Sequence, residues 1–451
     1  MPSRKALALF VAALLLTFAA AAEAPETSAA KPAERSLRTP DLVLDPEVTL
    51  VDEEGAGKLY QVGEHAVCVM EGTPEQMGYQ HGRLLAPKIH EIMKEGYVVK
   101  ALYGRGYTKD YINAQSERME KHFPPEYIEE MRGVVKGCHA AGFEDVTYEE
   151  VRVGATMAEI MHHGPDAPPG CSNFAAWGQW TTDGRLLHGR NLDWDVSSGA
   201  QKSAAVLVWR PEGGTPFMMV GWAGSIGSVS GMSADGITIG EMTSSSTDET
   251  FDGLPLFLIM RRVIEKGHTL EGAVRIMHQG PRTTGWNLII GDGKIPDGRA
   301  LEVDAVDCEV FGPMDSKEGP QTGHWAMEDA VRRTNHPIGL KIIHKLVELH
   351  GPRFGIEKDN LQAAIPLLQM QNTWLRYNWM GKQIQARPGK LDVVECLQLL
   401  GNAPVWCPVT LHSFVFDPKN QTAYVAIAGT DPNTTATSRA FTKIDLSRWF
   451  Q

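Results

Sequence analysis

Apolar positions follow two different patterns along the chain, and the change falls near residue 170. Before it, residues 73–76 combine a capping threonine, a proline at the first helical position and a glutamine that reaches back to the cap. Apolar side chains then recur at helical spacing, and Pro87 is expected to kink or end this helix. Residues 124–126 open another helix. We therefore expect a mostly helical segment that runs to about Ile160.

The rest of the chain has short apolar runs of strand length, with helices between them. A strand is also expected within residues 59–70. The later strands are expected at 204–209, 217–221, 236–240, 288–290, 414–416 and 423–426. Helices are expected at 254–266, 269–278, 340–349, 361–370 and 393–400. Strands, then helices, then strands again predict an α/β (α+β) fold in which helices cover sheets.

The two parts meet at Gly170 and Cys171. Residues 173–177 are expected to form a strand, an Asp-Gly pair within 182–185 predicts a turn, and residues 186–189 form the return strand. This hairpin would bring Arg190 and Asp193 back beside Cys171.

Cys171 has the features of a nucleophile that a backbone cut would activate. A thiol needs a base, and cleavage of the Gly170–Cys171 bond would give Cys171 its own α-amine, with an ordinary pKa of about 7.7–8.0. Gly170 has no Cβ and so permits a close approach of the thiol to its carbonyl. An anionic Asp193 could hold the new α-ammonium, and a cationic Arg190 could favour the thiolate and polarise a substrate carbonyl.

The Gly-Cys pair, the hairpin and the Gly-Arg-Asn-Leu-Asp-Trp run over 189–194 resemble the N-terminal-nucleophile (Ntn) hydrolases. The nearest type is isopenicillin-N acyltransferase (acyl-coenzyme A:6-aminopenicillanate acyltransferase), with choloylglycine hydrolase, penicillin V acylase and acid ceramidase as relatives. Residues 72–82 also resemble the start of this family. The resemblance implies a four-layer α-β-β-α sandwich, autoproteolysis before Cys171, and a site lined by Arg190 and Asp193. It also implies that the part before the cysteine stays bound as a separate chain.

The resemblance suggests further site residues. Asn335, in the run 333–337, matches an asparagine that binds the oxyanion, and an amide N–H suits that role without adding charge. Around 231–243 relatives often carry another asparagine donor, but here Ser233 and Thr243 occupy the approximate positions, so backbone N–H groups are an alternative. Asn287 is a weaker polar candidate. Arg376 loosely matches a distal site arginine, although we favour an arginine on a helix surface.

Histidines offer no metal-binding pattern. His162, His163 and His81 lack metal-ligand spacing, so we expect them in loops or on the surface and predict neither a metal nor another cofactor. His412 as a partner for Cys171 would give a papain-like pair, although the local pattern of such enzymes is missing.

Several tryptophan and methionine residues are candidates to line an apolar acyl pocket, although most are expected in the core: Trp177, Trp194, Trp222, Met218 and Met242.

Composition and the first residues indicate an exported protein. Of the 451 residues 43% are hydrophobic, and the net charge of −12 argues against a nucleic-acid partner. Residues 1–24 have a positive start, an apolar middle and small residues at a cleavage site, as in a secretory signal peptide. Residues 25–46 read as a flexible leader, and no later run is long enough to span a membrane. Six cysteines are widely spaced, so no disulfide pairing follows.

The sequence therefore predicts a secreted or periplasmic Ntn amidase or acyltransferase made as an inactive precursor. Residues 47–170 would form the N-terminal chain and residues 171–451 the catalytic chain, bound to each other. The substrate would be a small N-acyl compound with a linear amide bond, cleaved through a thioester; a homo-oligomer is compatible with the sequence. Two alternatives remain: a Cys-His thiol hydrolase without autocleavage, and a non-catalytic single-chain binding protein with the same fold.

Overall fold

The computed structural model describes residues 37–162, 170–194, 196–319, 322–431 and 433–451. The predicted signal peptide, most of the leader and His163 lie outside these residues. The end of the predicted leader is described, and there β1 (Leu42–Val43) pairs in parallel with the strand that begins at Phe441.

One sheet carries the predicted hairpin. It has seven strands, and Cys171 is the first residue of β5, opposite Leu192 of β6. The order across the sheet is β1, β17 (Phe441–Asp445), β16 (Thr422–Ile427), β15 (Thr410–Asp417), β6 (Leu187–Asp193), β5 (Cys171–Ala176) and β14 (Ala330–Arg333). The hairpin prediction is therefore confirmed, with Gly184 in the left-handed region at φ +77° in its turn.

The other sheet joins the two parts of the chain. Its ten strands include three from the N-terminal segment, and β4 pairs with β7 in parallel. The order is β13 (Cys308–Phe311), β12 (Asp297–Val303), β11 (Trp286–Asp292), β10 (Ile237–Thr243), β9 (Ser230–Ser233), β8 (Phe217–Trp222), β7 (Ala204–Pro211), β4 (His65–Gly72), β3 (Gly57–Val62) and β2 (Val48–Glu54). The strand expected within 59–70 is thus two antiparallel strands, β3 and β4.

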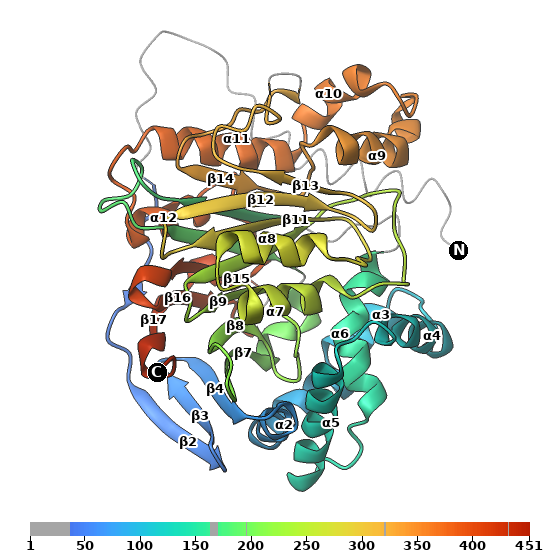
Figure 1. The fold of residues 1–451 in the computed structure, drawn as a ribbon, viewed down its shortest axis with the longest axis vertical. Helices are drawn as coiled ribbons and strands as arrows, with labels where there is room; N and C mark the ends of the chain where they lie inside the picture. The colour runs from blue at the N-terminus through green and yellow to red at the C-terminus, as the bar shows by residue number, and fades with distance from the viewer. Residues whose placement is uncertain (1–36, 163–169, 195, 320–321, 432) are drawn as a thin grey trace. The chain divides into compact units, whose positions relative to one another are not determined.

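The sheets pack face to face, and helices cover their outer faces (Figure 1). Between the sheets, Phe414 and Phe416 of one pack with Val206 and Val208 of the other. Helices α11 (Asn372–Gln385) and α12 (Val393–Leu400) cover the seven-stranded sheet. The ten-stranded sheet is covered mainly by α2 (Pro74–His90), α5 (Pro125–Ala140), α6 (Tyr148–His162), α7 (Leu256–Lys266) and α8 (Leu270–His278). These four layers confirm the predicted fold class.

The remaining α-helices within the described residues are α3 (Tyr97–Tyr103), α4 (Lys109–Glu120), α9 (Leu340–His350) and α10 (Leu361–Gln369). The predicted start of α2 is confirmed, with both hydrogen bonds of the Thr73–Gln76 capping box. Pro87 does not end α2, which continues to His90 and passes into a π-helical turn, η1 (Glu91–Glu95). The wide turn accommodates the residues that follow the proline without breaking the helical path.

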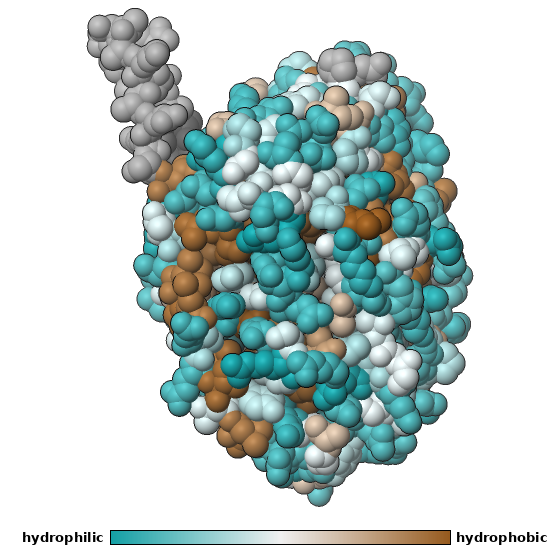
Figure 2. Space-filling model, turned by 60° about the vertical axis from the view of Figure 1, so that its left-hand side comes forward, coloured by the Kyte–Doolittle hydropathy of each residue, from teal (hydrophilic) through white to brown (hydrophobic). Residues whose placement is uncertain are grey.

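The face shown in Figure 2 is mainly hydrophilic, and its apolar residues gather toward one edge and in smaller patches. Among the described residues, no helix combines the length and the apolar character needed to cross a bilayer. All six cysteines are unpaired thiols.

Candidate active site

The structure brings most of the predicted site residues together around the Gly170–Cys171 bond. Cys171 is 4% exposed, and its Sγ lies 3.8 Å from Nη2 of Arg190. The carbonyl oxygen of Gly170 accepts a hydrogen bond of 3.0 Å from the backbone N–H of Asp193. The antiparallel register of β5 and β6 sets this arrangement, because it places the end of β6 beside the start of β5.

Arg190 crosses from the seven-stranded sheet to β10 and β9 of the other sheet. Its side chain is fully buried and pairs with Glu241, with 2.5 Å between Nη2 and Oε1. It also donates to the backbone carbonyl of Glu241 at 2.8 Å and to Oγ of Ser230 at 2.5 Å. A buried arginine needs such partners. The guanidinium is thereby fixed between the carboxylate and the thiol.

Asp193 is a buried carboxyl group at the end of β6. It is 1% exposed, and its Oδ1 accepts a hydrogen bond of 2.7 Å from Thr410. Burial raises the pKa of Asp193 to about 6, although the charges of Arg376 and Arg190 and the Thr410 hydrogen bond oppose the rise. Asp193 therefore changes charge close to neutral pH.

Asn335 holds the backbone nitrogen of Cys171. Its Oδ1 accepts from that nitrogen at 2.6 Å and from Nη2 of Arg376 at 2.9 Å. Its Nδ2 donates to the backbone carbonyl of Thr243 at 3.0 Å and to Oγ1 of Thr243 at 2.9 Å. Two donors on one side and two acceptors on the other fix which end of the amide is oxygen.

Arg376 is not on a helix surface, and that interpretation is wrong. It is 4% exposed, and it donates to the carbonyl oxygen of Cys171 and, at 2.8 Å, to Oγ of Ser172. A Cβ on Gly170 would lie only 2.6 Å from its Nη2 and 3.1 Å from Oδ1 of Asn335. The structure thus explains why position 170 is glycine in a way that the sequence did not show. A side chain there would collide with the groups that hold Cys171.

Asn287 and Ser233 lie outside this cluster of contacts. Asn287 Nδ2 donates to the backbone carbonyls of Thr334 at 2.8 Å and His336 at 2.9 Å, which flank Asn335. It therefore positions the segment that carries the asparagine. Ser233 accepts a hydrogen bond from the backbone N–H of Ile237 in the turn between β9 and β10.

The histidines are buried, so their expected placement in loops or on the surface is wrong for His81 and His162. His81 accepts from the backbone N–H of Gly224 at 2.9 Å, and Nδ1 of His162 lies 3.1 Å from Glu249. His412 stands opposite Leu192, which in turn stands opposite Cys171. Two strand spacings separate their backbones by about 10 Å. Burial also lowers the pKa of His412 to about 3, and this arrangement does not favour a papain-like pair.

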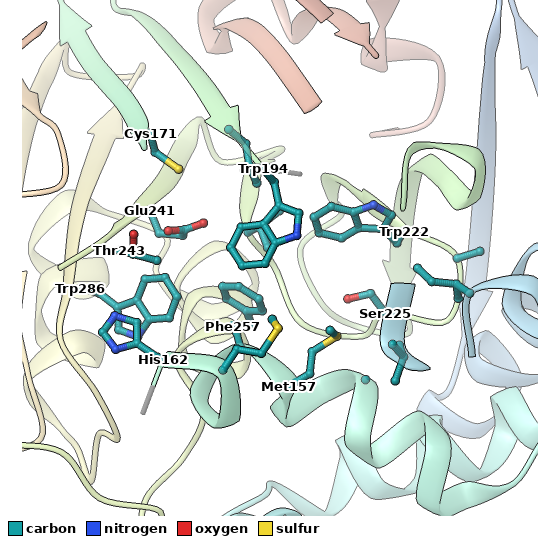
Figure 3. A pocket seen from close by; sticks show the side chains of 18 of the residues that line it. Met157, His162, Cys171, Trp194, Trp222, Ser225, Glu241, Thr243, Phe257 and Trp286 are labelled. Atoms are coloured by element: carbon teal, nitrogen blue, oxygen red, sulfur yellow. The ribbon is translucent and has the colours of Figure 1, made fainter. Parts of the chain in front are cut away.

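An apolar pocket opens beside the thiol (Figure 3). Trp194, Trp222 and Trp286 line it together with Phe257 and several methionines. The pocket runs from Cys171, Glu241 and Thr243 at one end toward Ser225 at the other. Of the predicted lining residues, Trp194 and Trp222 face the pocket, whereas the others pack in the hydrophobic cores: Trp177, Met218 and Met242.

The thiol is held in its neutral form in this uncut chain. Burial raises the pKa of Cys171 to about 12; the charge of Glu241 adds to the rise, and the charge of Arg190 opposes it. A neutral thiol needs a base before it can attack. No side-chain hydrogen-bond partner other than Arg190 contacts the thiol among the described residues.

Glu241 and Thr373 belong to the site although the sequence did not predict a role for them. Oε2 of Glu241 is buried without a hydrogen-bond partner in the described part of the chain. A lone carboxylate in the apolar run of β10 is a signal that could have indicated it. Thr373 is the second residue of α11 and accepts a hydrogen bond from the backbone N–H of Asn335 at 2.8 Å, but no local pattern marks it.

One acidic cluster outside the pocket has the spacing of cation ligands. Asp248, Asp304 and Asp307 converge there, and Nζ of Lys345 lies 2.6–2.7 Å from all three carboxylates. The ammonium group already lies where a cation would bind and offsets part of their negative charge, and Nζ of Lys341 lies 3.4 Å from Asp307, so the cluster is explained by an internal ion-pair network.

A family model supports the resemblance that the sequence indicated. The model described as AAT: Acyl-coenzyme A:6-aminopenicillanic acid acyl-transferase matches residues 180–297. This range begins after Cys171 and contains Arg190, Asp193, Thr243 and Asn287. The resemblance to the acyltransferase type is thus confirmed over this part of the chain.

Two individual proteins are similar to this chain, one over less than half of its own length and the other at 22% identity. The chain is 31% identical over 260 residues to an uncharacterized protein of Archaeoglobus fulgidus, covering 52% of this chain and 43% of that protein. It therefore spans less than half the length of this relative. It is 22% identical over 420 residues to Protein dcd1B of Dictyostelium discoideum, covering 86% of this chain and 74% of that protein.

Two solved structures are similar at low identity. A Caenorhabditis elegans ortholog of N-acylethanolamine-hydrolyzing acid amidase has 15% identity and a TM-score of 0.37, covering 55% of this chain and 93% of that chain. A mutant conjugated bile acid hydrolase from Clostridium perfringens has 12% identity and a TM-score of 0.37, and the match covers 62% of this chain and 93% of that chain. The family model that matches is described as an acyl-transferase.

Proposed function

We propose that this chain is the precursor of an N-terminal cysteine amidase, which cuts itself before Cys171 and then cleaves linear amides of N-acyl compounds. One observation carries the proposal. The nitrogen that would become the α-amine of Cys171 lies 2.6 Å from Oδ1 of Asn335, while the thiol of the same residue faces an apolar pocket. One residue would then supply nucleophile and base at the mouth of a substrate site.

The first step would be an internal acyl shift. The Cys171 sulfur attacks the carbonyl carbon of Gly170, and the Asp193 N–H donates to the oxyanion that forms on this carbonyl. The C–N bond breaks, the nitrogen keeps the pair of electrons and takes the thiol proton, and a thioester remains. Water then attacks the thioester, which releases the Gly170 carboxylate and the free thiol.

In turnover the new α-amine would take the thiol proton as sulfur attacks the substrate carbonyl. Oδ1 of Asn335 holds this amine and Asp193 balances its charge. The Thr243 hydroxyl suits an oxyanion donor, because its oxygen accepts from Asn335 Nδ2 and its hydrogen is free to turn into the pocket. The proton passes to the leaving amine, and the acyl group remains on sulfur as a thioester.

The acyl-enzyme then passes its acyl group to water or to an amine. The predicted export signal favours hydrolysis, because water is the abundant acceptor and acyl-coenzyme A, an acyl donor, is scarce outside the cytosol. The apolar lining of the pocket, with its tryptophans and methionines, suits an apolar acyl group better than a charged one.

Intact mass and N-terminal sequencing of the purified protein test the proposal. We expect two bound fragments, one starting Cys171-Ser172-Asn173, and a Cys171→Ala variant that stays uncut. The cut protein should then release amines from N-acyl amides. An uncut wild-type chain without amidase activity would contradict the proposal and favour the single-chain binding protein. An uncut chain with activity would favour a thiol hydrolase that uses an internal cysteine.

A further inference from the structure

One face of α6 forms a wall of the pocket. Gly154, Met157, Ala158 and Met161 all line it, and their spacing of i, i+3, i+4 and i+7 marks a single helix face. Glycine inside a helix is less stable than alanine by roughly 0.5–1 kcal/mol. Gly154 thus occupies the one position of this stripe where the missing side chain costs helix stability.

The space at Gly154 is taken by the end of a methionine from another element. A Cβ on Gly154 would lie 2.9 Å from Cε of Met93, and a Cβ on Gly224 would lie 3.2 Å from the same atom. Met93 is 3% exposed, lines the pocket and belongs to the π-helical turn η1. The tip of Met93 thus fills the space that a side chain at either glycine would take, and because methionine is unbranched and flexible its tip can move to another rotamer when that space is changed.

This contact lies far from the reacting atoms. His162, at the other end of α6, packs against Trp286 with ring centroids 5.1 Å apart, on the Glu241 and Thr243 side of the pocket (Figure 3). Gly154 is eight residues earlier, or roughly 12 Å along the helix axis. Gly224 precedes Ser225, which Figure 3 places at the end of the pocket away from Cys171.

We propose that Met93, held between Gly154 and Gly224, is the adjustable end wall that sets the length of the acyl chain the pocket accepts. The inference rests on the proposed amidase function and adds its substrate class: straight, apolar acyl groups measured against this wall. Residues of the N-terminal segment would then decide the specificity of a reaction performed by the C-terminal part.

The test compares Gly154→Ala and Met93→Ala with the wild type on 4-nitroanilides of straight-chain acids from acetyl to palmitoyl. Gly154→Ala should push Met93 into the pocket and lower kcat/KM for the longest accepted chains by roughly tenfold, the low end of what one methylene is worth in a pocket. The shortest chains should be unaffected, and Met93→Ala should extend the range to longer chains. Glu149→Ala, on an exposed position of the same helix, is the matched control.

Two further readouts separate this inference from the function it rests on. Gly154→Ala should leave the melting temperature unchanged or higher, since alanine favours the helix; equal losses for every chain length would overturn the inference. If the wild type cleaves anilides but all variants share one length profile, the inference fails and the amidase stands. If no anilide is cleaved, quenching of tryptophan fluorescence by straight-chain fatty acids shows which chain lengths bind. The same dependence on chain length in all variants would refute the role of Met93 as the end wall.

Discussion

Replacing Asp193 by asparagine should increase the stability of the fold near neutral pH and abolish most of the amidase activity. The carboxyl group is 1% exposed, and burial raises its pKa to about 6, compared with about 3.9 in an unfolded chain. A difference of about two pH units corresponds to roughly 3 kcal/mol. Because the folded-state pKa is the higher one, this contribution to stability is present below about pH 4 and is lost as the pH rises through about 6.

The variant has no carboxyl group to titrate there. Asparagine keeps an acceptor for Thr410, whose hydroxyl donates to Asp193 at 2.7 Å, so packing changes little. Compared with its parent, Asp193→Asn should therefore gain roughly 3 kcal/mol of stability between pH 4 and pH 7. In the cut enzyme the same change should abolish most of the amidase activity, since the α-ammonium loses its counter-charge.

The measurement is urea unfolding from pH 4 to pH 8, with both proteins in a Cys171→Ala background so that neither is cut. The thiol does not contribute to the titration, because both proteins carry alanine at position 171. A difference in unfolding free energy that stays flat over this range would refute the reasoning, because Asp193 would then titrate at its ordinary value. A difference that changes in the opposite direction would mean that Asp193 is stabilised as the anion.

Three further substitutions test other contacts. Thr243→Val should lower kcat by roughly 100- to 1000-fold, as for a lost oxyanion donor, with Thr243→Ser retaining most activity; equal kcat values for both in a steady-state assay would contradict this. Glu130→Gln should cost about 3 kcal/mol in urea unfolding, because Arg261, 2.5 Å from Glu130 and 1% exposed, loses its buried partner; a loss below about 1 kcal/mol would contradict the pair's importance. Thr73→Ala should cost about 1 kcal/mol by removing the cap of α2, whereas an unchanged melting temperature would mean that the cap is dispensable.

The sequence predicted well what depends on neighbours along the chain. The cap at Thr73, the hairpin after Cys171 and the strand-length apolar runs are all decided by a few adjacent residues, and the structure has them. Arg376 was misjudged because burial of an arginine depends on partners 204 and 205 positions away, in Ser172 and Cys171. Its spacing of four and eight residues from the buried Met380 and Ile384 was a signal that the pattern contained.

The contacts of Glu241 and Thr373 could not be predicted in the same way. Glu241 meets Arg190 only because two sheets stack, and Thr373 meets Asn335 only because α11 packs over the end of β14. Such contacts depend on register and layer order, which hydrophobic periodicity does not encode. The chemical types of the site residues were visible in the sequence, whereas the groups that aim them were not.

The parallel pairing of β4 with β7 has a consequence for the order of events in the cell. If the two parts were made as separate chains, the edge of β7 that pairs with β4 would be exposed. Its six paired positions, from Val206 to Pro211, could then pair with a strand of another molecule. When both parts are made as one chain, β4 of the N-terminal segment can pair with this edge of β7 before another molecule does. We therefore expect separately expressed pieces to aggregate rather than reassemble. The uncut chain would then protect its own sheet edge during folding, and cleavage would avoid aggregation only after β4 has paired with β7.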